Sequence, residues 1–165
     1  MQNYYIAGFK ARLDQYLTLT QDWKIFSCSE NITDFCVKIL PMNILTYGFE
    51  KGEYVLPEDI RYVFRQNHEV LLTNQNWTKS YIISASNFDE AQILLMRIFR
   101  THAVRRQMIQ LHCATIDDGG RGILFLGPSG IGKTTQAERW AQYRGSAIIN
   151  GDIGFVQRTP AGYTA

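Results

Sequence analysis

The chain has 165 residues, of which 45% are hydrophobic and 13% aromatic. This is enough apolar material for one domain, or for one domain with a small extra layer. The formal net charge of +2 is too small to favour a nucleic-acid partner. No basic N-terminal segment precedes an apolar one, and no apolar run approaches the length that spans a membrane, so we expect neither a signal peptide nor a membrane anchor.

The chain contains three cysteines, Cys28, Cys36 and Cys113. They form no Cys-x-x-Cys pair, and no set of Cys and His has the spacing of a zinc site. An odd number of cysteines without a signal peptide predicts free thiols in a reducing compartment. We therefore expect a cytoplasmic protein.

The first 86 residues are expected to form a small, mostly β layer. The aromatic run Tyr4–Phe9 predicts one strand, and the alternation of apolar and polar residues over Ile32–Leu40 predicts another, which Pro41 closes. Trp23–Cys28 is a weaker strand candidate, and Ala11–Leu19 is ambiguous. The remaining expectations are short strands at Tyr62–Phe64, Glu69–Leu72 and Tyr81–Ile83, a turn at Asn74–Asn76, and a loop over Gly48–Pro57.

The pattern changes at Asn87, a residue type that caps helices. Apolar residues then recur at three- and four-residue spacing, which predicts a helix with one core face that runs to about Arg105. The core residues of this helix are Ala91, Leu94, Leu95, Ile98 and Phe99. The change divides the chain into 1–86 and 87–165, two regions expected to pack as one unit.

A group of basic residues lies along and just after this helix. Its members are Arg97, Arg100, His102, Arg105 and Arg106. A solvated helix face explains them better than a patch for phosphate or for an acidic partner.

The last third of the chain alternates strands with one helix. A strand over Met108–Ile116 and a turn at Asp117–Gly120 lead to a buried strand over Gly122–Leu126. The elements expected after it are a helix over Thr134–Tyr143 ended by Gly145, a buried strand over Ala147–Asn150, and a hairpin with arms at Gly154–Arg158 and from Tyr163 onward.

The stretch after the strand over Gly122–Leu126 carries a complete phosphate-loop pattern, in which Gly127 is followed by four residues and then by Gly132, Lys133 and Thr134. Glycines let successive backbone N–H groups turn toward an anion, Lys133 can reach the β and γ phosphates, and the Thr134 hydroxyl can bind Mg²⁺. A plain glycine-rich turn with a solvated lysine is the alternative, but it leaves the Lys-Thr order unexplained. The predicted nucleotide-binding residues are Gly127, Pro128, Ser129, Gly130, Ile131, Gly132, Lys133, Thr134 and Thr135.

Asp152 is the candidate for a second acidic element of this site. It follows the strand over Ala147–Asn150, and only one helix and one strand separate it from Lys133. An acid at a strand end beside the loop can hold Mg²⁺ or accept a proton. A solvated turn aspartate is the alternative interpretation.

Three segments in this order resemble one family. The segments Leu111–Thr115, Gly122–Thr135 and Ile148–Asp152 look like those of the HPr kinase/phosphorylase family, whose core ATP-dependent phosphoenolpyruvate carboxykinase shares. The resemblance covers Gln110–Ala165 well and the first hundred residues loosely. It implies an α/β fold with a phosphate-loop core and a smaller, mostly β N-terminal layer.

The resemblance also implies roles for individual residues, with ATP and Mg²⁺ as cofactors. Lys133 would bind phosphate, and Thr134 would bind the metal. Asp152 would activate the acceptor or hold the metal, and His112 would lie near the phosphates. For His112, an equal alternative is a strand histidine whose hydrogen bonds are satisfied within the protein and which has no role at the phosphates.

Two departures from the family pattern affect the functional prediction. The family often has two adjacent acids where this chain has Gly151 and Asp152. Its members also continue beyond the hairpin, so we expect a C-terminally truncated member: a truncated gene, a fragment, or a remnant that only binds nucleotide.

The sequence therefore predicts an ATP-dependent kinase that phosphorylates a hydroxyl of a protein or small molecule. A nucleotide-binding module without catalysis is the alternative. The Asn-Lys-x-Asp signature of guanine recognition is missing, which disfavours a GTPase. The sequence leaves open whether the chain forms a homo-oligomer.

Overall fold

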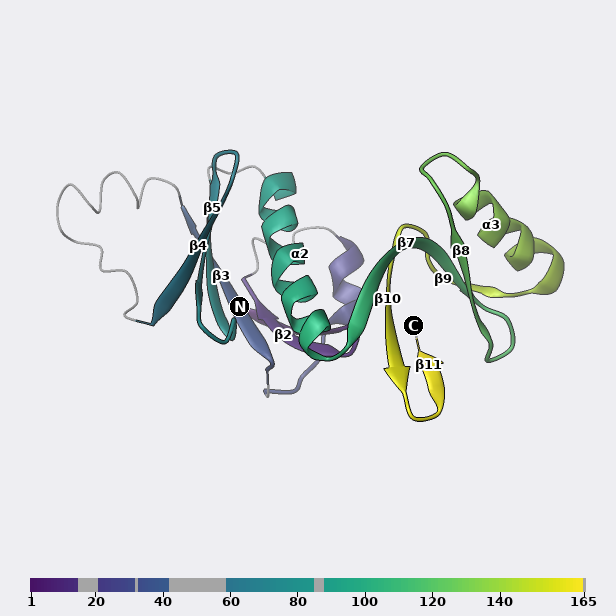
Figure 1. Ribbon diagram of the computed structural model, residues 1–165, viewed down its shortest axis with the longest axis horizontal. Helices are drawn as coiled ribbons and strands as arrows, with labels where there is room; N and C mark the ends of the chain where they lie inside the picture. Colours follow the sequence, from purple (N-terminus) through teal and green to yellow (C-terminus); the bar gives the residue numbers. More distant parts are fainter. Residues whose placement is uncertain (15–20, 32, 42–58, 85–87, 165) are drawn as a thin grey trace. The chain divides into compact units, whose positions relative to one another are not determined.

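The computed structural model describes residues 1–14, 21–31, 33–41, 59–84 and 88–164 (Figure 1). The chain divides into two compact units, residues 1–99 and 100–165. The division falls inside helix α2 (Phe88–Arg105), whereas the boundary drawn from the sequence lies just before that helix. The two units are described separately.

The first unit contains a six-stranded sheet in the order β1-β2-β3-β6-β5-β4. Its strands are β1 (Gln2–Ile6), β2 (Phe9–Leu13), β3 (Phe35–Pro41), β4 (Ile60–Gln66), β5 (Glu69–Asn74) and β6 (Lys79–Ser84). β3 pairs parallel with β2 and β6, and the remaining pairs are antiparallel. The strands predicted in the regions of β3, β4, β5 and β6 are confirmed, as is the turn after β5, where the Trp77 N–H donates to the Asn74 carbonyl at 3.0 Å.

Two predictions in this unit are wrong. The expected strand over Tyr4–Phe9 is a hairpin, because Ala7 (φ 49°) and Gly8 (φ 78°) form the positive-φ turn that reverses tightly paired strands. The weaker strand candidate over Trp23–Cys28 is mostly the 3-10 helix η2 (Gln21–Phe26). The loop over Gly48–Pro57 and the cap at Asn87 lie outside the described residues.

The core face of α2 in the first unit is confirmed. Its apolar residues Ala91, Leu94, Leu95, Ile98 and Phe99 are all buried. The Phe99 ring meets the rings of Phe9 and Phe35 edge-on, at 6.0 and 5.0 Å between centroids, a favourable aromatic arrangement.

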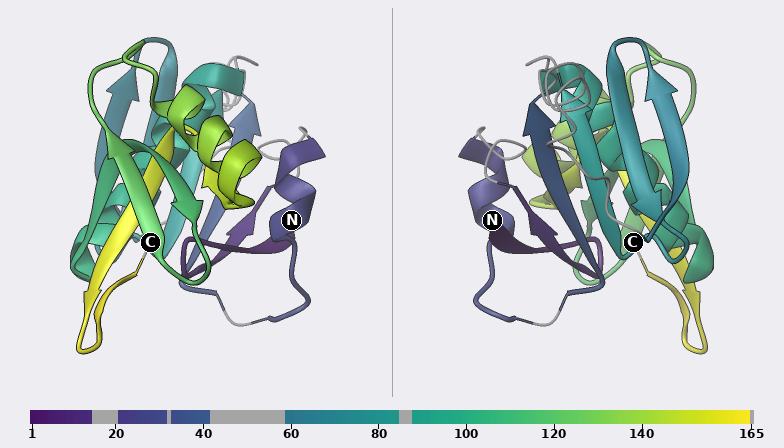
Figure 2. Two further views of the ribbon diagram at one scale, coloured as in Figure 1. Left: turned by 90° about the vertical axis from the view of Figure 1, so that its right-hand side faces the viewer. Right: turned by 90° about the vertical axis from the view of Figure 1, so that its left-hand side faces the viewer.

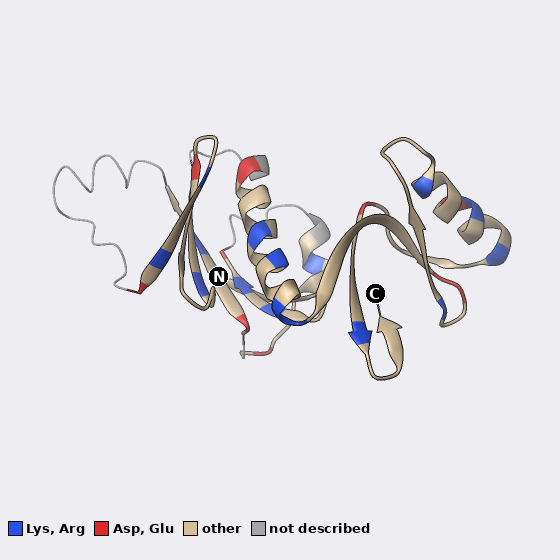
Figure 3. Cartoon of the chain, viewed as in Figure 1, with Lys and Arg blue, Asp and Glu red and all other residues tan. Residues whose placement is uncertain are grey.

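Figure 3 shows the Lys and Arg residues of α2 spread along the helix. The Arg97 guanidinium stacks over the Phe64 ring at 5.0 Å, and Arg100 donates to Gln110. At least these two arginines are therefore engaged by the protein itself, which favours a structural interpretation of the basic group.

The second unit is built around strand β7 (Met108–Asp117). β8 (Gly122–Leu126) pairs along one side of it, while β9 (Ala147–Asn150) and β10 (Ile153–Thr159) follow each other along the other side. β11 (Gly162–Thr164) pairs with β10 and confirms the predicted hairpin, which extends away from helix α3 (Lys133–Arg144) (Figure 2). Of the helices in the described part of the chain, none combines the length and apolarity needed to cross a membrane.

The predicted α/β fold with a phosphate-loop kinase core is wrong. Within the residues that the structure describes, the fold is mostly β, with 49% strand, 24% helix, two α-helices and two sheets. Every strand pair in the second unit is antiparallel. The short turn after β7 explains this difference, because a few residues can join antiparallel neighbours, whereas parallel neighbours need a long crossover.

The predicted burial of β8 and β9 is also wrong. Leu126 is 60% exposed and Ile149 59% exposed. The middle residues of β8 are only partly buried, and Ile123 and Phe125 pack with residues of β7 and α3. A short apolar run does not distinguish a fully buried strand from one covered on a single face. The buried centre of this cluster is Ala114, Ile116 and Ala137, and Trp140 packs against it.

The C-terminal end of α3 is fixed by a polar cluster. Gly145 (φ 71°) ends the helix as predicted, and its N–H donates to the Ala141 carbonyl. Asp118, in the turn after β7, accepts from the Arg144 guanidinium at 2.8 Å and from the Ser146 hydroxyl at 2.6 Å. These bonds lower the pKa of Asp118, with the Arg144 bond the largest cause. They join the β7–β8 turn to the end of α3.

We expect Asp118→Asn to lower the melting temperature at pH 7, because it removes the charge from this pair. Since the folded pKa lies below the unfolded value of about 3.9, the stabilisation is present above that value. It is lost as the pH falls through the folded pKa. The difference between wild type and variant should therefore vanish in strong acid.

Thermal unfolding followed by circular dichroism from pH 7 to pH 2 measures this effect. Glu138→Gln, an exposed position on the same helix, is the matched control and should show no such pH-dependent difference. A constant difference between wild type and Asp118→Asn at every pH would contradict the assignment to the charged pair.

Candidate phosphate-binding site

The pairing around β7 brings two loops to one edge of the second sheet. β8 and β9 both pair antiparallel with residues 115–117 of β7, so they lie on opposite sides of β7 and run in the same direction. Their carboxyl ends therefore meet at one edge of the sheet. The loop 127–132 leaves the end of β8, and the turn formed by Gly151 and Asp152 leaves the end of β9.

The loop has the backbone angles that its glycines were predicted to provide. Gly127, Gly130 and Gly132 have φ angles of 154°, 78° and 97°, which residues with side chains rarely adopt. Gly132 caps α3 without a side-chain hydrogen bond, and the first turn of the helix carries no acid. The N–H groups of that turn, and the positive end of the helix dipole, are thus left for an external anion.

Lys133 lies inside the loop and is only 7% exposed. Its ammonium donates to the carbonyl oxygens of Gly127 at 3.0 Å and of Pro128 at 3.1 Å. Within the described part of the chain, no carboxylate forms an ion pair with it. A buried cation that has only neutral partners is costly, so this geometry favours an anionic ligand.

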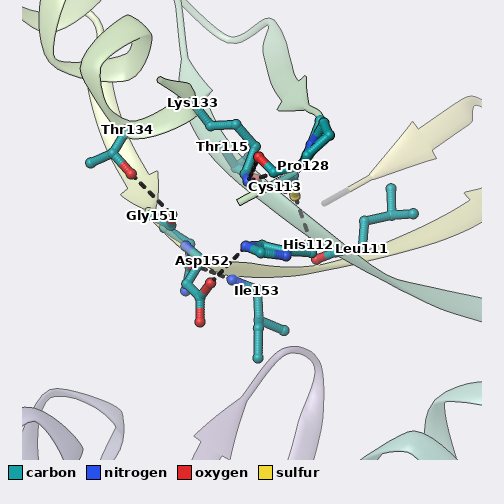
Figure 4. A network of polar contacts seen from close by, with 12 residues as sticks. Leu111, His112, Cys113, Thr115, Pro128, Lys133, Thr134, Gly151, Asp152 and Ile153 are labelled. Carbon is teal, nitrogen blue, oxygen red and sulfur yellow. Dashed lines mark hydrogen bonds and ion pairs between the residues drawn. The ribbon is translucent and has the colours of Figure 1, made fainter. Parts of the chain in front are cut away.

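Thr134 connects the helix to the turn after β9. Its hydroxyl lies 3.4 Å from the Gly151 carbonyl oxygen and donates to it. The hydroxyl thus contacts the turn that carries Asp152, while the Asp152 carboxylate itself pairs with His112 (Figure 4). Because a hydroxyl has one hydrogen and two lone pairs, the lone pairs of this oxygen are left for a cation. The other predicted loop residues, Pro128, Ser129, Gly130, Ile131 and Thr135, are exposed.

His112 and Asp152 form a pair beside the loop. His112 Nε2 lies 3.1 Å from Asp152 Oδ1, and the two side chains are 54% and 77% exposed. Figure 4 shows this pair next to the Thr134–Gly151 contact. A carboxylate held by a histidine can accept a proton or bind a cation.

The backbone of Asp152 is fixed by neighbours that the sequence analysis did not identify. Its N–H and that of Ile153 both donate to Asn150 Oδ1, at 2.8 and 2.9 Å. Its carbonyl accepts from the Cys113 N–H at 3.0 Å. An Asn followed by Gly-Asp at a strand end is a recognisable signal for such a side-chain turn.

The structure brings the predicted site residues together in three groups. Lys133 contacts its own loop, Thr134 contacts Gly151, and His112 contacts Asp152. In residues 100–164, no direct hydrogen bond joins Lys133 to the His112–Asp152 pair. Among the described residues, no three or more His, Cys, Asp or Glu side chains are grouped to hold a metal ion. Mg²⁺ bound with a nucleotide differs from such a cluster, because phosphate oxygens supply part of its ligands.

No protein-family model and no curated protein matches the chain. The function is therefore inferred from the geometry and chemistry of this site.

The tight approach of Ile131 to Gly127 generates a prediction about the loop. A Cβ added at Gly127 would lie 2.9 Å from Ile131 Cγ2, while one added at Gly130 would meet nothing within 4 Å. Both substitutions strain a positive φ, at a cost of about 1–3 kcal/mol. Gly127→Ala adds a steric clash, so it should destabilise the protein more than Gly130→Ala.

Urea unfolding of the two variants measures the difference in unfolding free energy. Adding Ile131→Ala to Gly127→Ala should recover the steric part of the loss, and adding it to Gly130→Ala should recover nothing. Equal losses for the two glycine variants would show that Ile131 does not pack on Gly127.

Proposed function

We propose that this chain binds ATP with Mg²⁺ at the loop and helix start formed by residues 127–135, and that it transfers the γ-phosphoryl group to a hydroxyl acceptor. One observation carries the nucleotide part of the proposal. Lys133 is buried at a helix N-terminus that has no side-chain cap, and its ammonium has neutral carbonyls as its hydrogen-bond partners among the described residues. A polyphosphate would supply the negative charge that this arrangement lacks.

Each side chain of the site has a separate task in this proposal. The loop amides and Lys133 bind the phosphates, while the Thr134 hydroxyl and the Asp152 carboxylate hold the cation. Mg²⁺ supplies neutralisation of the charge that develops on the phosphates during transfer. Asp152 takes the proton of the acceptor hydroxyl, and His112 keeps that carboxylate oriented through its hydrogen bond.

The order of the three segments supports this assignment through their resemblance to the HPr kinase/phosphorylase family. Membership of that family is part of the proposal, and so is a cytoplasmic location. The latter is supported by Cys28, Cys36 and Cys113, which are free thiols. ATP, rather than GTP, is favoured by the missing guanine signature.

A nucleotide-binding module without catalysis is the second candidate. The observation that favours it is the exposure of the His112–Asp152 pair, because a catalytic base for phosphoryl transfer acts best where water is excluded. Gly151, which stands where the resembled family often has a second acid, supports it as well.

We expect Lys133→Ala to weaken the binding of Mg²⁺–ATP. A charge-assisted contact contributes about 1.5–3 kcal/mol, so the dissociation constant should rise roughly tenfold to a hundredfold. Isothermal titration calorimetry on wild type and variant measures the change.

Lys79→Ala is the charge-matched control, because Lys79 is an exposed lysine of the first unit. It should bind Mg²⁺–ATP as wild type does. Equal affinities for wild type and Lys133→Ala would place the lysine outside the nucleotide site.

The catalytic part of the proposal predicts a different result for Asp152→Asn. This substitution keeps the shape of the side chain and removes its basicity. Transfer should fall by on the order of 10²–10⁴, while the affinity for ATP measured in EDTA, where no cation is held, stays unchanged. The measurement is phosphoryl transfer from labelled ATP to hydroxyl acceptors, compared with calorimetric affinity.

Wild-type binding without any transfer or hydrolysis would support the binding module. Undiminished transfer by Asp152→Asn would show that the carboxylate is not the base.

A further inference from the structure

We infer that Asn150 is a positioning residue of this site, which fixes the turn between the metal ligand Thr134 and the acid Asp152. The inference rests on the proposed function and deepens it. It names the residue that holds the cation ligands in position for the binding of Mg²⁺ with the nucleotide. Asn150 itself touches neither phosphate nor metal in this account. It acts through the backbone N–H groups of Asp152 and Ile153, which follow Gly151 in the turn.

The turn is held by hydrogen bonds from three directions. Asn150 Oδ1 accepts from the N–H groups of Asp152 and Ile153, at 2.8 and 2.9 Å. The Thr134 hydroxyl of α3 donates to the Gly151 carbonyl at 3.4 Å. The Cys113 N–H of β7 donates to the Asp152 carbonyl at 3.0 Å. Thr134 and Cys113 belong to other elements, α3 and β7. Asn150 is the last residue of β9, so it bonds the turn that directly follows it in the chain.

Packing does not fix the turn. Gly151 has no side chain, and a Cβ placed on it would meet no atom within 4 Å. Asp152 is mostly exposed. The direction of the Gly151 carbonyl therefore depends on hydrogen bonds, and the two bonds to Asn150 are the shortest of those that hold the turn.

The direction of that carbonyl decides how Thr134 is presented. The single hydrogen of the Thr134 hydroxyl is used by Gly151, which leaves the lone pairs of the same oxygen directed away from the turn. Asp152 follows Gly151 in the same turn, at the edge of the sheet where β8 and β9 end. Loss of the Asn150 bonds would free the Gly151 carbonyl that orients the Thr134 hydroxyl and the Asp152 carboxylate. It would leave the loop amides and Lys133 in place.

The inference predicts a selective effect on cation-dependent binding. Asn150→Ala should weaken Mg²⁺–ATP binding roughly tenfold, the value expected for the loss of two hydrogen bonds. Its affinity for ATP in EDTA should equal that of wild type, because the phosphate contacts remain. Asn150→Asp keeps an acceptor oxygen at the same place and should retain the dependence on Mg²⁺.

Calorimetric titrations with ATP, in Mg²⁺ and in EDTA, measure both affinities for each variant. Asn74→Ala is the matched control, because Asn74 Oδ1 also accepts a turn N–H, that of Lys79 at 3.2 Å, in the first unit. It should leave both affinities unchanged. If Asn150→Ala does not fold, Asn150→Ser takes its place, since a hydroxyl makes the same turn more weakly. That variant should show a smaller, equally selective loss.

Two results would overturn the inference alone. Asn150→Ala could bind Mg²⁺–ATP as tightly as wild type, or it could lose affinity equally in Mg²⁺ and in EDTA, as a purely structural residue would. Wild type that binds no nucleotide under either condition would instead overturn the proposed function, and the inference with it.

Discussion

The pairing of β7 with strands on both of its sides is the constraint on which the second unit depends. Residues 115–117 of this strand pair with β8 and with β9, so the ends of those two strands are fixed at one sheet edge. The glycine loop follows one end, and the turn at Asp152 follows the other. His112 is part of β7 itself. One central strand therefore places the glycine loop, the acid and the histidine at the same end of the sheet.

The chemistry of the site follows from an imbalance of charge at this edge. The Lys133 ammonium is buried against two carbonyls, and α3 begins there without a side-chain cap. The other end of the helix is balanced, because the Arg144–Asp118 ion pair joins it to the turn after β7. Stabilisation at the C-terminal end and unsatisfied donors at the N-terminal end together favour an anion bound at the loop.

Local signals in the sequence predicted much of this unit. Gly145 indicated the end of α3, and the glycine spacing indicated the loop. Strand direction was not predictable in the same way, because a short apolar run such as β8 has no mark of parallel or antiparallel pairing. Asp152 was expected beside the loop because only one helix and one strand separate it from Lys133. The antiparallel pairing of β8 and β9 with β7 brings the ends of both strands to the same edge. The role of Asn150 was missed although the Asn-Gly-Asp order at a strand end signals such a side-chain turn, because Asn150 was read only as the last residue of a strand.

Backbone amide chemical shifts, measured by ¹H–¹⁵N correlation spectra during titration with Mg²⁺–ATP, test the central claim most directly. The account predicts that the largest changes occur at Gly130, Gly132, Lys133 and Thr134, with smaller changes at Gly151 and Asp152. Residues of the six-stranded sheet of the first unit should change little. Unchanged loop amides at saturating Mg²⁺–ATP, or changes confined to the first unit, would contradict a phosphate site at the start of α3.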